Sequence, residues 1–236
     1  MDWTEWLYII SGFLIFVVII VAIVAQAKVY SAYDKYSKKT SSLGLTGQML
    51  AQKLCEQNNL ALTIRSCSGK LSDHYNPKDK SINISQENFN SSSVASIAIV
   101  AHEFGHAMQD QEEYAPLKIR QFAIKVSSFA SKALLPFLIV SILLSIFIGY
   151  VGTIMLFVVV VVYAFSLFIN LVTLSVEVDA SNRAKKMLST MISDEEEQKA
   201  MSNMLSAAAM TYVASMLVSL VYFLRFLSLF LMSRRD

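Results

Sequence analysis

Two stretches of the sequence contain no charged side chain and are long enough to cross a lipid bilayer. Residues 7–25 and residues 133–176 are made almost entirely of apolar side chains. A helix needs about 20 such residues to cross the hydrocarbon layer, so the first stretch suits one span and the second suits two. The whole chain is 55% hydrophobic and only 16% charged. The sequence therefore predicts an integral multi-pass membrane protein.

Four spans are expected from the apolar pattern, at about residues 7–26, 133–149, 153–176 and 211–232. The sequence GYVG at 149–152 predicts a tight turn between the second and third spans. The fourth segment contains Arg225, which favours burial against protein or a snorkelling position. A full crossing would place Arg234 and Arg235 outside, against the positive-inside rule, so a full crossing and a re-entrant or interfacial segment both remain open for residues 211–232.

Charge around the first span predicts its orientation. The flank MDWTE before the span is acidic, which favours a retained span over a cleaved signal peptide. Four lysines follow the span, and no basic residue precedes it. The positive-inside rule then places residues 28–132 on the cytoplasmic side of the plasma (inner) membrane.

Two polar regions, residues 28–132 and 177–210, carry the remaining secondary structure. Apolar spacing predicts an amphipathic helix at 45–58, and short strands are expected at 60–66, 71–75 and 81–85, the last two forming a hairpin. A helix begins at Val94 after the capping residues NSSS. Another begins within SDEEE at 193–197, with Ser193 as its cap and the acids in solvent. The fold class is mainly α, with multi-pass transmembrane helices and a small β-hairpin or sheet.

The helix from Val94 contains the sequence AHEFGHAMQD at residues 101–110. Positions i and i+4 share one face of a helix, so His102 and His106 can both bind one metal ion. Glu103 lies one step around the helix and can face a water molecule held by that metal. This is the HExxH arrangement of zinc hydrolases, in which the glutamate is the general base.

A catalytic zinc usually has three protein ligands, and three residues are candidates for the third. Glu112 lies six residues after His106, but Gln109 stands where the extended HExxHxxGxxH motif needs glycine. His74 on the predicted hairpin is the chain's remaining histidine. Glu177 is the favoured candidate, because it is the first acid after residues 133–176 and an acid at a span end is a functional candidate.

Several motifs in order resemble one protein family: LSDHYNP, VAHEFGHAMQ, YAPLKIR, TLSVEVDASNRA and AAAMTYVA. The chain resembles the membrane-bound neutral zinc metallopeptidase family of bacteria from its first span to about residue 225, and is distantly similar to the integral-membrane gluzincins. The resemblance implies one zincin-like HExxH domain over residues 1–236, with His102, His106 and Glu177 as zinc ligands and Glu103 as base. Ser175 and Val178 depart from the usual family sequence TLPVEFDAS, but neither is a ligand.

The surroundings of the metal are less sharply predicted. The wider gluzincins have an acid four residues after the ligand glutamate, where this chain has Ser181. The nearest acid, Asp179, is expected either to orient a histidine or to pair with Arg183. Candidates for stabilising the oxyanion are His74, Tyr75, Arg183 and Tyr212, with a bond from His74 to Asp73 as the structural alternative. The strand SINIS at 81–85 could bind an extended substrate by edge pairing.

These features predict a zinc-dependent membrane endopeptidase with one zinc ion per chain, acting on peptides or membrane proteins in the lipid bilayer. The alternatives are a non-catalytic membrane scaffold or quality-control adaptor with a structural zinc, and a metal transporter, which would need acids or histidines within its spans. A net charge of +2 without a long basic run predicts no nucleic-acid partner. Cys55 and Cys67 are expected as two buried thiols or one disulfide, and no sequence feature specifies an oligomeric state.

Overall fold

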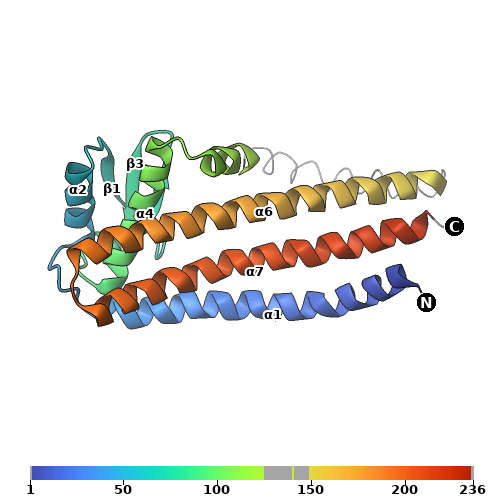
Figure 1. Ribbon diagram of the computed structural model, residues 1–236, viewed down its shortest axis with the longest axis horizontal. Helices are drawn as coiled ribbons and strands as arrows, with labels where there is room; N and C mark the ends of the chain where they lie inside the picture. Colours follow the sequence, from blue (N-terminus) through green and yellow to red (C-terminus); the bar gives the residue numbers. More distant parts are fainter. Residues whose placement is uncertain (1, 125–139, 141–148, 235–236) are drawn as a thin grey trace. The chain divides into compact units, whose positions relative to one another are not determined.

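The computed structural model describes residues 2–124, 140 and 149–234, and Figure 1 labels its helices and strands. Three long helices dominate these residues: α1 (Trp3–Ser37), α6 (Gly149–Met191) and α7 (Glu195–Ser233). Each of the three is long and apolar enough to cross a membrane. The predicted fold class, a mainly α membrane protein with a small sheet, is confirmed.

The predicted spans correspond to these helices with one correction. The first, third and fourth spans lie within α1, α6 and α7, whereas the second, at 133–149, falls almost entirely outside the described residues. The turn predicted at GYVG is wrong, because residues 149–152 form the beginning of α6. In an apolar environment a helix satisfies its own backbone polar groups, so two glycines do not have to end it. The helix α7 runs unbroken through Arg225, which favours a crossing over a re-entrant segment.

The chain divides into two compact units. The apolar unit contains Met1–Val24, Lys118–Leu174 and Tyr212–Asp236, and the polar unit contains Ala25–Leu117 and Ser175–Thr211. The candidate site residues belong to the polar unit, except for Tyr212. Residues 115–124 are also helical.

Within the apolar unit, Arg225 of α7 is held by Tyr8 of α1. Its guanidinium donates hydrogen bonds to the Tyr8 hydroxyl at 2.9 Å and to the Tyr8 carbonyl at 3.3 Å. The guanidinium carbon lies 4.2 Å from the centre of the Tyr8 ring, within cation–π distance. Arg225 is therefore packed against protein, as the sequence predicted for a charge within an apolar segment.

Within the polar unit, three short strands form one sheet in the order β1-β3-β2. The strand β1 (Thr63–Cys67) pairs with β3 (Ser81–Ser85) in parallel, and β2 (His74–Asn76) pairs with β3 in antiparallel register. The predicted hairpin is confirmed, but β3 is the central strand and has partners on both sides. SINIS therefore has no free edge for a substrate. The two edges of the sheet belong to β1 and β2.

Two helices pack against this sheet (Figure 1), and buried side chains of α1, α6 and α7 complete the core that they share with it. The two helices are α2 (Gly47–Gln57), capped by the Thr46 hydroxyl, and α4 (Val94–Gln111), capped by the Ser93 hydroxyl, with the short α3 (Gln86–Phe89) before α4. The cap predicted from NSSS is confirmed, and α4 buries most of its length because its residues on every side are small or apolar. Cys55 and Cys67 are both free thiols and are partly buried.

The acidic run before α7 is only partly solvated. Asp194, rather than Ser193, caps the helix by accepting from the Glu196 amide at 3.0 Å. Glu197 is buried, and its carboxylate accepts bonds from the Ser41 hydroxyl and from the Ser42 amide at 3.1 Å. The prediction of a fully solvated run is therefore wrong at Glu197, which joins the start of α7 to the loop after α1.

We expect Glu197→Ala to lower the free energy of unfolding by about 2 kcal/mol, because it leaves the buried Ser41 hydroxyl and the Ser42 amide without their charged acceptor. Thermal unfolding in detergent would measure the loss. Glu195→Ala is the matched control, since Glu195 is exposed on the same helical turn and should change stability little. Equal effects of the two substitutions would contradict this role of Glu197.

Candidate metal centre

Helix α4 presents two imidazoles on one face. His102 and His106 are one turn apart, their ring centres lie 4.8 Å apart, and the rings are nearly perpendicular at 81°. His106 is buried and His102 is partly exposed. The i, i+4 spacing thus brings the two side chains together, as the sequence predicted.

Helix α6 brings a carboxylate to these imidazoles. The Glu177 carboxylate oxygen Oε2 lies 3.2 Å from His102 Nε2 and 3.7 Å from His106 Nε2. Their possible ligand atoms all lie within 4.8 Å of one another. Two donors that share one tetrahedral zinc ion at about 2 Å are about 3.3 Å apart, so this nitrogen and oxygen set fits zinc.

Gly105 allows the two helices to approach closely enough for this arrangement. A Cβ atom at Gly105 would lie 2.6 Å from the carbonyl oxygen of Ala180 in α6. That neighbour is backbone rather than a flexible side chain, so any larger residue must push the helices apart. The glycine inside HEFGH is therefore a packing requirement of the site.

Each histidine is also held through its second ring nitrogen. His102 Nδ1 lies 3.2 Å from the Ser181 hydroxyl, and His106 Nδ1 lies 3.0 Å from the side-chain oxygen of Gln109. The side-chain amide of Gln109 donates to the Val176 carbonyl and to the Asp179 carboxylate, both at 2.8 Å. Both of these partners can only accept, which fixes the orientation of the amide.

The orientation of Gln109 determines the tautomer of His106. Because the amide nitrogen faces two acceptors, the amide oxygen faces His106 and must receive a proton from Nδ1. The Nε2 atom, which points toward Glu177, then carries the lone pair that a metal ion requires. A fully buried glutamine therefore prepares His106 to act as a ligand.

Asp179 reaches a histidine only through Gln109. Its carboxylate accepts from Gln109 and, at 2.6 Å, from Nε of Arg183, so the predicted pair with Arg183 is present. Arg183 also donates to Glu112 at 2.7 Å. Glu112 is half-exposed at the end of α4, and this bond lowers the pKa of its carboxyl. Glu112 lies outside the group of possible ligands.

Glu103 is fixed by the edge strand β2. Its Oε2 accepts a hydrogen bond from the Tyr75 amide at 2.8 Å. Burial raises the pKa of the Glu103 carboxyl above its ordinary value of 4.5; the imidazoles of His102 and His106 oppose this effect, and the Glu177 carboxylate adds to it. A raised pKa suits a carboxylate that exchanges protons near neutral pH.

The other predicted site residues are engaged elsewhere or lie in the other unit. His74 is exposed and bonds the Ser72 carbonyl at 2.8 Å, rather than Asp73 as the alternative predicted. Asp73 instead accepts from Ser85 and Asn88. The Tyr75 hydroxyl donates to Asp110 at 2.6 Å. Tyr212 lies in α7 within the apolar unit, so its role in the site stays a prediction.

Three contributors to this site were not predicted from the sequence: Gly105, Gln109 and Ser181. A partial signal existed for two of them, since Gln109 is three residues after His106 and Ser181 is four after Glu177. Both spacings place a polar side chain on the same helical face as the ligand. What the spacing does not indicate is which side chain contacts which histidine across the two helices.

The site and the long helices together define a class: a membrane protein in which the two histidines of an HExxH helix meet a glutamate of a second helix in a largely buried group. The chain belongs to the family described as "Putative neutral zinc metallopeptidase", whose model matches residues 11–231. It is 35% identical over 202 residues to the "Putative membrane protease YugP" of Bacillus subtilis (strain 168), a match that covers 85% of this chain and 87% of that relative. No solved structure matches. The family resemblance predicted from the motifs is confirmed.

We expect Gly105→Ala to reduce zinc affinity at least tenfold, because the added methyl group displaces Glu177 relative to the two histidines. Zinc affinity can be measured by competition with a chromophoric chelator on protein purified in detergent. The control is Gly152→Ala, a helical glycine of α6 where the added methyl group would have no neighbouring atom within 4 Å. Unchanged zinc affinity in Gly105→Ala would show that the close approach is unnecessary.

We expect Gln109→Met to weaken zinc binding by about 10- to 100-fold, because methionine keeps the volume but cannot accept the proton of His106 Nδ1. The same competition assay measures the change. Gln111→Met, two residues further along α4, is the control, since Gln111 is exposed. Wild-type affinity in Gln109→Met would contradict the assigned tautomer.

Proposed function

We propose that this chain is a single membrane-embedded zinc endopeptidase, in which His102, His106 and Glu177 hold one zinc ion and Glu103 is the general base. The observation that carries the proposal is the convergence of three side chains that could hold a metal ion, His102, His106 and Glu177, with the carboxylate of Glu103 beside them. The family membership supports zinc as the metal and a peptide as the substrate.

When bound, zinc would lower the pKa of a water molecule and polarise the carbonyl of the scissile peptide bond. Glu103 accepts a proton from the attacking water and later transfers it to the leaving amine. Because the Tyr75 amide holds one oxygen of Glu103, the carboxylate keeps a fixed position during both transfers. Burial of the group excludes bulk water, which strengthens each of these interactions.

The edge of β2 is the proposed site for the peptide backbone. The Tyr75 amide points away from β3 toward Glu103, and in an antiparallel ladder the carbonyl of the same residue points to the same side. An extended peptide whose N–H donates to the Tyr75 carbonyl would therefore run beside the general base, while the Tyr75 amide stays bonded to Glu103. This replaces the edge pairing first expected at SINIS.

The three candidate spans support substrates that are membrane proteins or unfolded segments near the membrane surface. The lysines after the first span support a cytoplasmic location of the polar unit at the plasma membrane. A scaffold that holds a structural zinc would not require an acid fixed beside the ligands. The hydrogen bond from Tyr75 to Glu103 therefore favours the enzyme over the scaffold.

We expect Glu103→Gln to keep one zinc ion per chain and to lower kcat by about 10²- to 10⁴-fold, because the amide cannot accept the proton. Elemental analysis and hydrolysis of an unfolded fluorescent protein substrate in detergent would measure the two properties. Glu177→Ala should lose both zinc and activity.

Glu112→Ala is the control and should keep both, since the Glu112 carboxylate is half-exposed and bonds Arg183. Wild-type kcat in Glu103→Gln would exclude Glu103 as the base. The scaffold would be favoured if the wild-type protein binds zinc but hydrolyses neither the unfolded protein substrate nor membrane-inserted peptides.

A further inference from the structure

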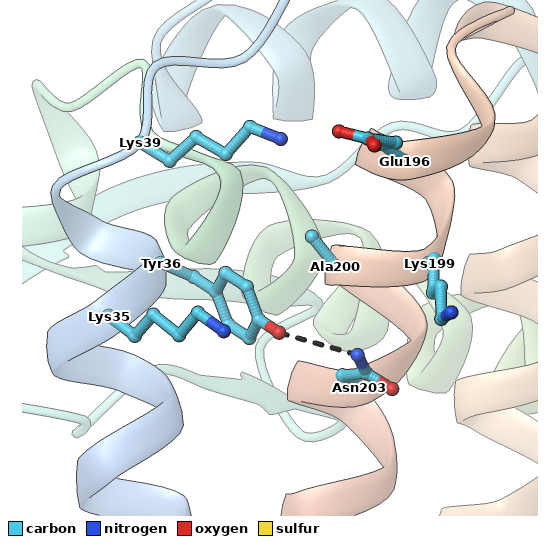
Figure 2. A pocket seen from close by; sticks show the side chains of 7 residues that line it. All are labelled: Lys35, Tyr36, Lys39, Glu196, Lys199, Ala200 and Asn203. Carbon is cyan, nitrogen blue, oxygen red and sulfur yellow. Dashed lines mark hydrogen bonds between the residues drawn. The ribbon is translucent and has the colours of Figure 1, made fainter.

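A pocket of about 460 Å³ lies between the C-terminal end of α1 and the first turns of α7, within the polar unit (Figure 2). Three lysines and one glutamate line it, Lys35, Lys39, Lys199 and Glu196, and the ammonium group of Lys199 points away from the other two (Figure 2). None of these residues belongs to the candidate metal centre. The volume falls within the range that small-molecule sites occupy.

The ammonium groups in this pocket are not neutralised by ion pairs. Lys39 and Glu196 point toward each other across the pocket, yet no hydrogen bond joins them (Figure 2). Among the described residues, Lys35, Lys39 and Lys199 have no carboxylate within ion-pair distance. By contrast, the neighbouring Lys38 pairs with Asp34 at 2.7 Å. The pocket therefore gathers ammonium groups that form no ion pair within the described part of the chain.

The floor of the pocket is rigid and partly polar. Tyr36 and Ala200 are buried, and the Asn203 amide donates to the Tyr36 hydroxyl at 3.3 Å. The Lys35 ammonium lies 5.3 Å from the centre of the Tyr36 ring. A ligand would thus meet an aromatic ring, an amide and a hydroxyl beneath the lysines.

The walls of the pocket are held by hydrogen bonds to other elements. The Lys39 carbonyl accepts from the amide of Val94, the first residue of α4, at 2.8 Å. On the opposite wall, Glu197 next to Glu196 bonds Ser41 and Ser42. The backbone beneath Lys39 and Glu196 is therefore fixed before any ligand arrives, which reduces the entropy lost on binding.

We propose that this pocket binds a small anion that carries a phosphate group, with Lys35 and Lys39 as the principal cations and Lys199 at the rim. A phosphate monoester carries about −1.5 to −2 charges at pH 7, and the ammonium groups of Lys35 and Lys39 supply the opposite charge within the pocket. Lysine is a common phosphate ligand because its ammonium is a compact point charge.

The position of the pocket favours a soluble phosphate compound over a lipid headgroup. Lys35 lies ten residues beyond Ala25, where the uncharged run ends, or ~15 Å along α1. The headgroup layer extends only about 5–8 Å beyond the hydrocarbon on each side. A phosphate between Lys35 and Lys39 would therefore lie outside that layer.

Equilibrium dialysis of radiolabelled inorganic phosphate against the full chain in phosphatidylcholine nanodiscs, at constant ionic strength, tests the proposal. We expect one saturable site per chain. Lys39→Gln should weaken it about fivefold, the effect of one charge at about 4 Å in water, whereas Glu196→Gln should tighten it. Lys38→Gln is the matched control and should leave phosphate binding unchanged, since Lys38 is outside the pocket.

Thermal unfolding without phosphate checks that the variants fold, and neither Lys39 nor Glu196 forms a side-chain hydrogen bond in the described structure. A parallel experiment uses nanodiscs that contain phosphatidic acid. If the chain binds phosphatidic acid through Lys39 but does not bind inorganic phosphate, the source of the phosphate group is a lipid. The proposal is overturned if neither phosphate source binds at millimolar concentration, or if Lys38→Gln weakens binding as much as Lys39→Gln.

Discussion

The candidate metal centre depends on the close approach of α4 and α6. At Gly105 the two helices meet with no side chain between them, because a Cβ atom there would overlap the Ala180 carbonyl. Across the same interface, Glu177 reaches the two imidazoles, Ser181 reaches His102, and Gln109 reaches Val176 and Asp179. One backbone contact therefore sets the distances of the ligands and of the residues that orient them.

This interface also concentrates charge in a dry environment. Glu103 and Glu177 are both buried close to two imidazoles, and a buried carboxylate is costly unless protons or a cation neutralise it. A zinc ion held by the three candidate ligands would neutralise part of this charge. The burial that makes these carboxylates costly therefore favours the binding of a cation beside them.

The loop after α1 links this centre to the rest of the polar unit. Its residues bond both the first residue of α4 and the buried Glu197 at the start of α7. Two adjacent acids consequently have different roles: Glu197 holds the loop, whereas Glu196 lines a pocket with three lysines. A phosphate in that pocket would lie between the end of α1 and the start of α7.

The sequence by itself determined the features that depend on local periodicity and composition. Apolar length predicted the membrane helices, the i, i+4 rule brought His102 and His106 to one face, NSSS predicted the cap of α4, and the first acid after an apolar span identified Glu177. Only the tertiary structure decided that β3 is central, that Gln109 stands between His106 and Asp179, that Ser181 contacts His102, and that Glu197 is buried. These contacts join residues far apart in the chain, such as Ser181 and His102, and depend on how closely two helices pack. Helical periodicity specifies a face, but the partner of that face is chosen by packing across the whole fold.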